Sequence, residues 1–271
     1  MAIITISRGT FSGGKALAER LAERLGYPCF SREMILADTA KEYGISVTEL
    51  TSAMHEPPPF WQQVPGKRIA YLKCFTAALL NRGDGGEFVY HGHAGHLLLG
   101  GISHVLRIRV IADAEYRIHA AMEQLNTSRE EAIAYIEKVD RERNRWMQFL
   151  YGLNWGEPTL YDAVLNLERM NIDSVCDVIT CFVGLDDFKA TAESEKAVKD
   201  LTLGTRVWAA LAKNEKTKAA FVQVVADNGN VVISGGAGSE KVVDAIPEVA
   251  RQVAGVGEIR NEVGIGGDWY W

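Results

Sequence analysis

The stretch that most constrains the fold of this chain is residues 3–25, where three kinds of local sequence follow one another directly. Residues 3–6 are a run of β-branched side chains typical of a strand. Residues 7–14 are mostly small and predict a turn, and residues 16–25 have the spacing of an amphipathic helix. The sequence therefore predicts a strand that passes through a glycine-rich turn into a helix.

The turn carries the pattern G-x-x-x-x-G-K, formed by Gly9, Gly14 and Lys15. Glycines let backbone N–H groups approach phosphate oxygens closely, and the N-terminus of the following helix adds donors and partial positive charge. Lys15 would neutralise the outer phosphates. The strand before the pattern and the helix after it favour a phosphate-binding loop over a generic turn.

One position of the pattern departs from its usual form. The Ser or Thr that follows the lysine and binds magnesium is Ala16 in this chain. Three alternatives stay open: Ser12 or Thr10 supplies the missing hydroxyl, the metal is held through water, or it is absent.

Composition limits the class of protein. The chain has 271 residues, 47% hydrophobic and 24% charged, which is enough for one sizeable domain and a small one. A formal net charge of −6 argues against broad nucleic-acid binding. The four cysteines show neither a C-x-x-C pair nor zinc spacing, so we expect reduced thiols in a cytoplasmic protein. We expect neither a signal peptide nor a membrane span, because no apolar run approaches 18 residues.

Strand and helix patterns alternate through the first two thirds of the chain, which predicts an α/β domain with a parallel sheet covered by helices on both faces. Its ligand should lie at the carboxyl ends of the strands, where the loop lies. Further strands are predicted at 26–30, 87–91, 105–111 and 161–166, helices at 31–43, 67–80 and 114–151 with a break at 126–128, and a loop at 55–60. Residues 172–183 fit a strand or a helix, and their apolar spacing favours the helix.

The pattern changes near Gly184. Residues 186–200 are polar and predict a linker helix. Residues 201–271 predict a small separate domain with the order α-β-β-α-β, dispensable for nucleotide binding. Its elements are expected at 203–211, 221–226, 231–235, 240–253 with an interruption at Pro247, and 255–263, with a hairpin turn at 228–230.

Residues 1–185 resemble the cytidylate kinase-like family of P-loop nucleoside monophosphate kinases. The stretches that carry the resemblance are 4–8, 12–15, 21–26, 112–117, 140–145 and 161–166. The resemblance implies ATP as cofactor, a pyrimidine nucleoside monophosphate as acceptor, and an arginine-rich lid that closes on the phosphates.

The resemblance also implies roles for individual residues. Catalysis falls to Lys15, Arg141 and Arg145, and Arg141 and Arg145 lie four apart, on one helix face. An alternative for these arginines is a solvated face that pairs with Glu137 and Glu142. The nucleotide-binding residues would be Gly9, Ser12, Gly13, Gly14, Lys15, Arg117 and Arg143.

The acceptor would be bound by Arg32 and His93. His93 stands where the family has an arginine, and Ser31 stands where it usually has an acidic residue. The spacing of His91, His93 and His96 also allows a metal site, but loop histidines near the pocket are preferred, and no metal-binding residue is assigned. Asp113, after an apolar strand, is a weaker candidate for contact with metal-bound water.

Residues 201–271 resemble a BON domain, through 228–235 and 255–261. Such domains are associated with membrane surfaces or with protein and ligand contacts, and a small packing domain without a ligand is the alternative. Three aromatic residues, Trp269, Tyr270 and Trp271, favour docking of the tail on another surface or a neighbouring subunit. The leading hypothesis for the whole chain is an ATP-dependent phosphotransferase, with regulation by the BON-like domain. The alternative is a nucleotide-binding regulatory or scaffold protein with a degenerate site, which Ala16 and His93 favour.

Overall fold

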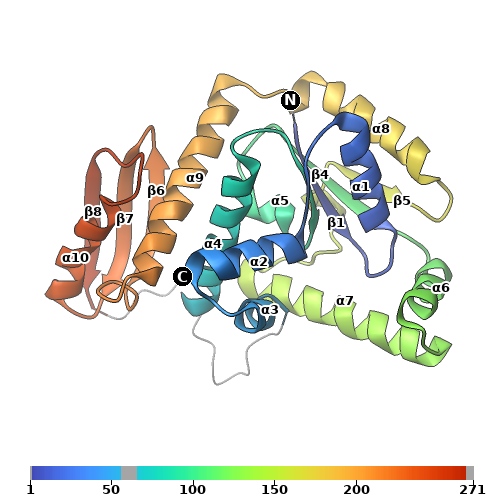
Figure 1. Cartoon of the computed structure of the whole chain (residues 1–271), viewed down its shortest axis with the longest axis horizontal. Helices are drawn as coiled ribbons and strands as arrows, with labels where there is room; N and C mark the ends of the chain where they lie inside the picture. Colours follow the sequence, from blue (N-terminus) through green and yellow to red (C-terminus); the bar gives the residue numbers. More distant parts are fainter. Residues whose placement is uncertain (1, 56–65, 267–271) are drawn as a thin grey trace. The chain divides into compact units, whose positions relative to one another are not determined.

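The structure is a computed structural model that describes residues 2–55 and 66–266 (Figure 1). The predicted loop at 55–60 and the aromatic tail lie largely outside the described residues. The chain divides into two compact units. The first unit holds Met1–Ile35, Thr51–Gln63 and Gly86–Thr191, and the second holds Leu36–Leu50, Val64–Gly85 and Ala192–Trp271.

The first unit is built on a parallel sheet of five strands in the order β2-β3-β1-β4-β5. The predicted α/β class with a parallel sheet is therefore confirmed. The strands are β1 (Ile3–Arg8), β2 (Cys29–Ser31), β3 (Val89–Gly92), β4 (Val105–Ile111) and β5 (Ala163–Asn166). The helices are α1 (Gly14–Leu25), the start of α2 (Arg32–Tyr43), the end of α3 (Val47–His55), α5 (Gly95–Leu98), α6 (Ala114–Leu125), α7 (Arg129–Tyr151) and α8 (Ile172–Gly184), with the short 3₁₀ turns η2 (Pro158–Leu160) and η3 (Asp186–Phe188).

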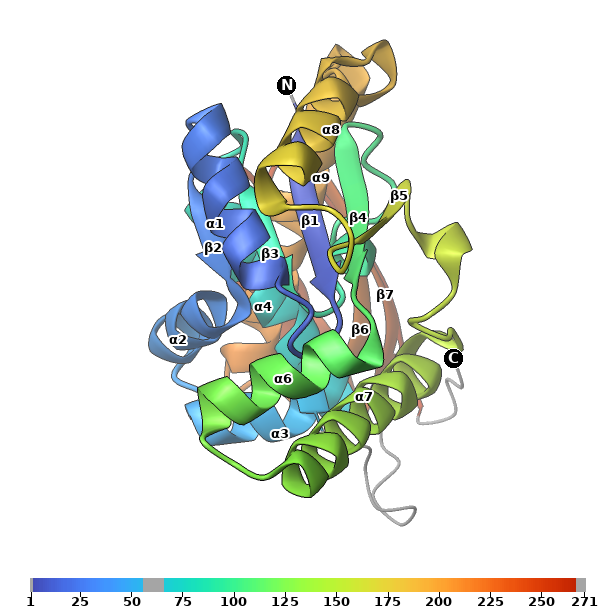
Figure 2. The same ribbon diagram turned by 90° about the vertical axis from the view of Figure 1, so that its right-hand side faces the viewer.

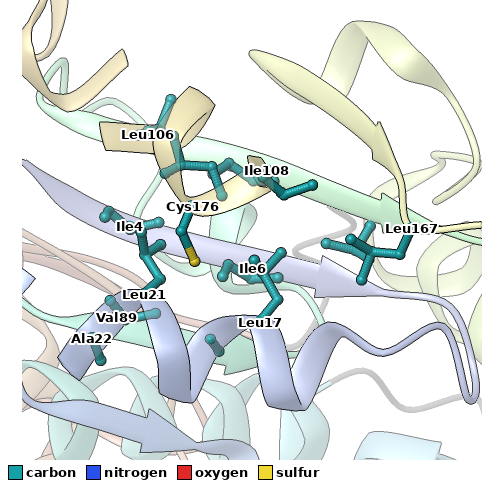
Figure 3. Close-up of a cluster of buried hydrophobic side chains, with 14 residues drawn as sticks. Ile4, Ile6, Leu17, Leu21, Ala22, Val89, Leu106, Ile108, Leu167 and Cys176 are labelled. Atoms are coloured by element: carbon teal, nitrogen blue, oxygen red, sulfur yellow. The ribbon is translucent and has the colours of Figure 1, made fainter. Parts of the chain in front are cut away.

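Helices α1 and α8 cover one face of this sheet (Figures 1 and 2). Figure 3 shows Leu17 and Leu21 of α1 directed at Ile4 and Ile6 of β1, with Cys176 of α8 beside them. All five side chains are at most 1% exposed. Alternation along β1 sends its even-numbered residues to this core and its odd-numbered residues to the opposite face, where α5 lies. The fold thus turns the last residue of β1, Arg8, toward the side of α1.

Helices α6 and α7 follow β4 and reach the carboxyl edge of the sheet. Asn126, in the left-handed region at φ 50°, ends α6. The side chain of Ser128 accepts from the backbone of Glu131, and that of Glu131 accepts from the backbone of Ser128, so a capping box starts α7. The predicted break at 126–128 is where the structure has it.

The second unit contains a three-stranded sheet in the order β6-β7-β8, with β6 (Phe221–Asp227) antiparallel and β8 (Ile259–Ile265) parallel to β7 (Asn230–Ala237). Helices α9 (Ala192–Lys213) and α10 (Glu240–Ala250) supply the apolar core over this sheet, and α4 (Gly66–Gly83) packs along α9. The small three-stranded unit with helices that the sequence predicts is present.

Two features of the second unit differ from the expected boundaries. Residues 192–213 form one continuous helix where a linker and a separate helix were expected, and Gly204 lies within it on the side that faces β6. The unit also includes α4, since Ile69 and Ala70 pack against its core, and Arg206 donates to Asn81 at 2.5 Å. Its residues are therefore not contiguous in sequence.

Helix α10 continues through Pro247, where an interruption was expected. Proline has no N–H to donate to the carbonyl four residues earlier, which belongs to Val243. The side chain of Asn261, from β8, donates to that carbonyl at 3.0 Å instead. The helix tolerates the proline because a neighbouring strand replaces the missing donor.

Across the residues that the structure describes, none of the helices is both long and apolar enough to cross a lipid bilayer.

Candidate functional site

The loop between β1 and α1 has a conformation that requires its glycines. Gly13 adopts φ +80°, in the left-handed region, and a β-carbon there would lie 3.0 Å from Leu167. A β-carbon on Gly14 would lie 2.6 Å from the β-carbon of Arg8, closer than folded proteins allow. The loop amide of Ser12 turns back to the Gly9 carbonyl at 3.1 Å. The loop is therefore wound tightly over the end of β1, and its last residue opens α1.

Both hydroxyls that could replace the missing one at Ala16 are used inside the protein. Ser12 donates to the carbonyl of Gly9 at 2.9 Å and approaches that of Val110 at 3.3 Å. Thr10 donates to the carboxylate of Asp140 at 2.7 Å. Both hydroxyls are therefore occupied by bonds within the protein. Neither replaces the Mg²⁺-binding hydroxyl that a Ser or Thr at position 16 would supply. Within the described stretches, no group of three or more His, Cys, Asp or Glu residues could hold a metal ion.

Helices α6 and α7 are joined to the loop by a charged network. Arg117 of α6 donates to the Thr10 carbonyl at 2.7 Å and pairs with Asp140 of α7. Arg143 of α7 donates to the Arg8 carbonyl at 3.1 Å and to the Thr10 hydroxyl at 3.0 Å. Burial lowers the pKa of Arg143 to about 10, although Asp140 opposes this shift. Two cations thus lie over the loop, held by its own acceptors.

The other predicted cations are in different surroundings. Lys15, at the start of α1, has a side chain that is 66% exposed and lies 3.8 Å from Glu19. Arg141 and Arg145 are exposed on α7 and make no hydrogen bond or ion pair with any residue that the structure describes. They also do not pair with Glu137 or Glu142. Of the three arginines in the predicted lid segment, the structure brings Arg143 to the loop and leaves Arg141 and Arg145 exposed.

A second group of charges lies at the end of β1. Arg8 and Arg32 are partly buried, and Arg32 pairs with Glu33 at 3.2 Å. Burial lowers the pKa of Arg8, and the neighbouring Arg32 lowers it further, while Glu33 opposes the shift. Despite burial, the nearby guanidinium groups and backbone donors hold the pKa of Glu33 below its usual value. Arg8, Arg32 and Glu33 thus form one group of interacting charges at the end of β1.

The three histidines are buried, which the prediction of loop histidines did not anticipate. His91 lies on β3 and His96 on α5, and burial lowers the pKa of both to about 4, so both are neutral at pH 7. His93 is 5% exposed and its ring lies 4.8 Å from that of Trp146. The imidazole of His93 is thus packed among aromatic rings.

Aromatic and charged side chains surround His93. Arg109 of β4 lies 4.2 Å from the ring of Trp155, and its guanidinium also donates to the Trp155 carbonyl. The hydroxyl of Tyr161 donates to the same carbonyl at 2.8 Å, and the ring of Tyr161 contacts that of His96 in a tilted arrangement, with 4.7 Å between the ring centroids. These contacts fix the segment after α7 against the opposite face of the sheet from α1.

Asp113 and several unanticipated residues complete the site. The carboxylate of Asp113 caps α6, where it accepts from the backbone of Glu115 at 2.7 Å. The sequence analysis missed Arg8, Asp140 and Trp155. Two of these had a signal: Arg8 directly precedes the loop's first glycine, and Asp140 lies three residues before Arg143, on the same side of a helix.

A parallel sheet with a glycine loop running from its central strand into a helix, covered by arginines from a later helix, defines the class of P-loop kinase-like proteins. Residues 3–169, more than half of the chain, match the model of the cytidylate kinase-like family. The chain therefore belongs to the cytidylate kinase-like family. The expectations of a kinase-like phosphotransferase and of its P-loop fold are confirmed at this level, and the family implies use of ATP and usually Mg²⁺.

Individual relatives are more distant. A cytidylate kinase of Staphylothermus marinus is 26% identical over 187 residues, which cover 68% of this chain and 97% of the relative. A cytidylate kinase of Pyrococcus horikoshii is 24% identical over 197 residues, which cover 72% of this chain and 94% of the relative. A crystal structure of an uncharacterized protein from Eubacterium ventriosum, 19% identical, matches with a TM-score of 0.52 over 68% of this chain and 99% of that one. This structural likeness concerns the fold alone.

Residues 199–267 match the model of the BON domain, as the resemblance predicted. The roles assigned to individual site residues stay predictions, which the experiments below address.

Proposed function

We propose that the first unit transfers the terminal phosphoryl group of ATP to a nucleoside monophosphate of the cytidylate type. The observation that carries this proposal is the pair of arginines, Arg117 and Arg143, that bind the backbone and hydroxyl of Thr10 in the loop. Cations beside a phosphate-binding loop are the groups that phosphoryl transfer requires, because its catalysis is positioning and charge stabilisation.

Each part of the site has a role in this proposal. The loop amides and the N-terminus of α1 would bind the donor phosphates, and Lys15 would neutralise the outer ones. Arg143 would exchange its bonds to Arg8 and Thr10 for the oxygens of the transferring group. Arg141 and Arg145 would reach the phosphates only after a change in α7 or its rotamers, so in the described conformation Arg143 is the lid arginine at the loop. Mg²⁺, bound to the nucleotide, would add charge neutralisation.

The test is a coupled phosphoryl-transfer assay with each common nucleoside monophosphate, beside calorimetry of ATP binding. Lys15→Ala should weaken ATP binding about tenfold or more, because a charge-assisted contact is lost. Lys138→Ala is the matched control, since Lys138 is 70% exposed and pairs with Glu142 on α7 at 4.0 Å. Unchanged ATP affinity in Lys15→Ala, with the fold intact, would overturn the assignment of the loop.

A second candidate function has its own supporting observation. Ala16 removes the usual hydroxyl ligand, and the hydroxyls of Ser12 and Thr10 bond within the protein. A nucleotide-binding regulatory or scaffold protein needs no turnover, and the BON-like unit or the tail would then supply the contact with a partner or a second copy. This candidate would be supported if the wild type binds ATP but transfers no phosphoryl group to any monophosphate, and if the Ala16→Ser variant does transfer it.

The proposal includes a cytoplasmic location, where ATP and nucleoside monophosphates are available. Regulation of transfer by the BON-like unit is part of the same proposal and would be detected as a change in kcat when a partner of that unit is added.

A further inference from the structure

Arg8 is a cation that the proposed donor site does not use. It ends β1, its side chain is partly buried, and its Nε is a buried nitrogen without a hydrogen-bond partner. Its guanidinium makes no hydrogen bond or ion pair with any residue in the described ranges. Burying such a group is costly unless something pairs with it, so its surroundings should show what does.

The surroundings of Arg8 have an excess of positive charge. The guanidinium groups of Arg8, Arg32 and Arg117 all act on that of Arg143, and Arg32 also acts on Arg8. The carboxylates that oppose them are Glu33, which pairs with Arg32, Asp140, which pairs with Arg117, and Glu19, which lies 3.8 Å from Lys15. The Nε of Arg143 is likewise buried without a partner. A bound anion would accept hydrogen bonds from the Nε atoms of both Arg8 and Arg143.

A neutral donor or acceptor adds to this group. His91 of β3 faces the same side of the sheet as Arg8, and its Nδ1 is buried without a partner. Because burial and Arg8 hold the imidazole neutral, one of its nitrogens carries a hydrogen and the other does not. An anion that accepts from Arg8 and Arg143 could also accept from this ring.

The position of the group separates it from the donor phosphates. Arg8, His91 and Arg32 come from β1, from β3 beside it, and from the start of α2 after β2, whereas Arg117 comes from α6, which follows β4 on the other side of β1. The attacking and leaving oxygens of phosphoryl transfer lie roughly in line, so donor and acceptor approach the loop from opposite sides.

We infer that Arg8, with Arg32, binds the phosphate monoester of the acceptor on the β3 side of the loop and supplies the permanent cation that His93 does not. The inference rests on the proposed function. It assigns a substrate-binding residue, and it places the acceptor's phosphate where Arg143 can reach both it and the donor.

The experiment compares Arg8→Met, Arg8→Lys and a control in the full chain. Methionine keeps the aliphatic stem that packs against Gly14 and removes the charge, and lysine keeps the charge without the planar donors. Arg20→Met is the control, because Arg20 is an exposed arginine of α1 that pairs with Glu23 and Asp173. Melting curves report whether each variant is folded.

Two measurements are made, binding of inorganic phosphate and of ADP by calorimetry, and steady-state kinetics with cytidylate. In Arg8→Met, phosphate affinity should fall and the KM of the monophosphate should rise, each about tenfold or more, while ADP affinity changes less than about twofold. Arg8→Lys should recover part of the loss, and Arg20→Met should behave as the wild type.

Unchanged phosphate affinity in a folded Arg8→Met variant would overturn the inference. An equal loss of ADP affinity would also overturn it, since Arg8 would then belong to the donor site. If the wild type transfers no phosphoryl group but the phosphate results are as expected, the anion site stands and the proposed function fails.

Discussion

The two units differ in how they treat buried polar groups. In the first unit, buried side-chain nitrogens or oxygens without a hydrogen-bond partner belong to Arg8, His91, His96, Arg143 and Asn144. Among the described residues of the second unit there is no such atom.

Polar groups of the second unit are paired where they are buried. The indole of Trp208 donates to the Val222 carbonyl at 2.8 Å, and Thr217 donates to that of Leu211 at 2.6 Å. Native proteins leave few such groups unsatisfied, and those that remain concentrate at sites that bind or react. The difference supports a binding site at the loop and indicates that the interior of the second unit is built for packing.

The largest expected effect concerns the boundary between the units. A truncated chain of residues 1–191 would remove α9 and leave the apolar side of α4, including Ile69 and Ala70, without the core it packs against. We expect its melting temperature to fall by about 10 °C or more, because several kcal/mol of apolar burial would be lost. An unchanged melting temperature and nucleotide affinity would instead support the separate, dispensable C-terminal domain predicted from the sequence.

The next prediction concerns pH. The folded-state pKa of His91 and of His96 is about 4, and an unfolded histidine has a pKa near 6.5. Because these pKa values are lower in the folded state, protonation favours unfolding. The free energy of unfolding should be highest above pH 6.5 and decline toward pH 4, by up to about 3 kcal/mol for each histidine.

His96→Phe isolates one of these groups. Neither ring nitrogen of His96 has a hydrogen-bond partner, so phenylalanine keeps the contact with Tyr161 and removes the titration. Urea unfolding between pH 7 and 4.5 should show a smaller pH slope in this variant than in the control His119→Phe, which changes an exposed histidine of α6. Equal slopes would mean that His96 is not neutralised by burial.

Gly14→Ala tests the loop alone. A β-carbon at this position would lie 2.6 Å from the β-carbon of Arg8, so the loop or the end of β1 must shift. Nucleotide affinity should fall about tenfold, because the phosphate-binding amides move with the loop. Gly184→Ala is the control, since nothing lies within 4 Å of a β-carbon there. Similar affinities in both variants would show that the loop tolerates the change.

The smallest effect is expected in the second unit. Asn261→Leu removes the donor to the Val243 carbonyl and should cost about 1–2 kcal/mol of unfolding free energy, with no change in nucleotide affinity. In a Pro247→Ala background the cost should shrink, because a backbone N–H at position 247 can serve that carbonyl. An equal cost in both backgrounds would assign the role of Asn261 to other contacts.

Local patterns predicted most of the fold. The spacing of apolar residues located the strands of the parallel sheet and α8, and Ser128 located the start of α7. These features depend only on residues that are close together in the sequence. The extent of α9 was not predictable in this way. The change of composition near residue 200 predicted a linker and a second helix, and local sequence does not show that both belong to one helix that packs on β6.

The site was predictable to the same degree. The loop pattern located the glycine turn between β1 and α1, but the spacing of the arginines on α7 says only which of them share a face, not which face is turned to the loop. That depends on the packing of α7, which buries Trp146 and brings Arg143 inward. Arg8 and the neutral histidines could not be assigned from sequence, because their chemistry comes from burial.

The second unit combines segments that are far apart in the sequence, and this has a consequence during synthesis. Helix α4 ends at Gly83, and α9, against which it packs, is complete only at Lys213, about 130 residues later. At about 5–20 residues per second, α4 leaves the ribosome roughly 6–26 s before its partner helix does. During that interval the side of α4 that packs on α9 lacks its partner, so this part of the second unit can be completed only late in synthesis.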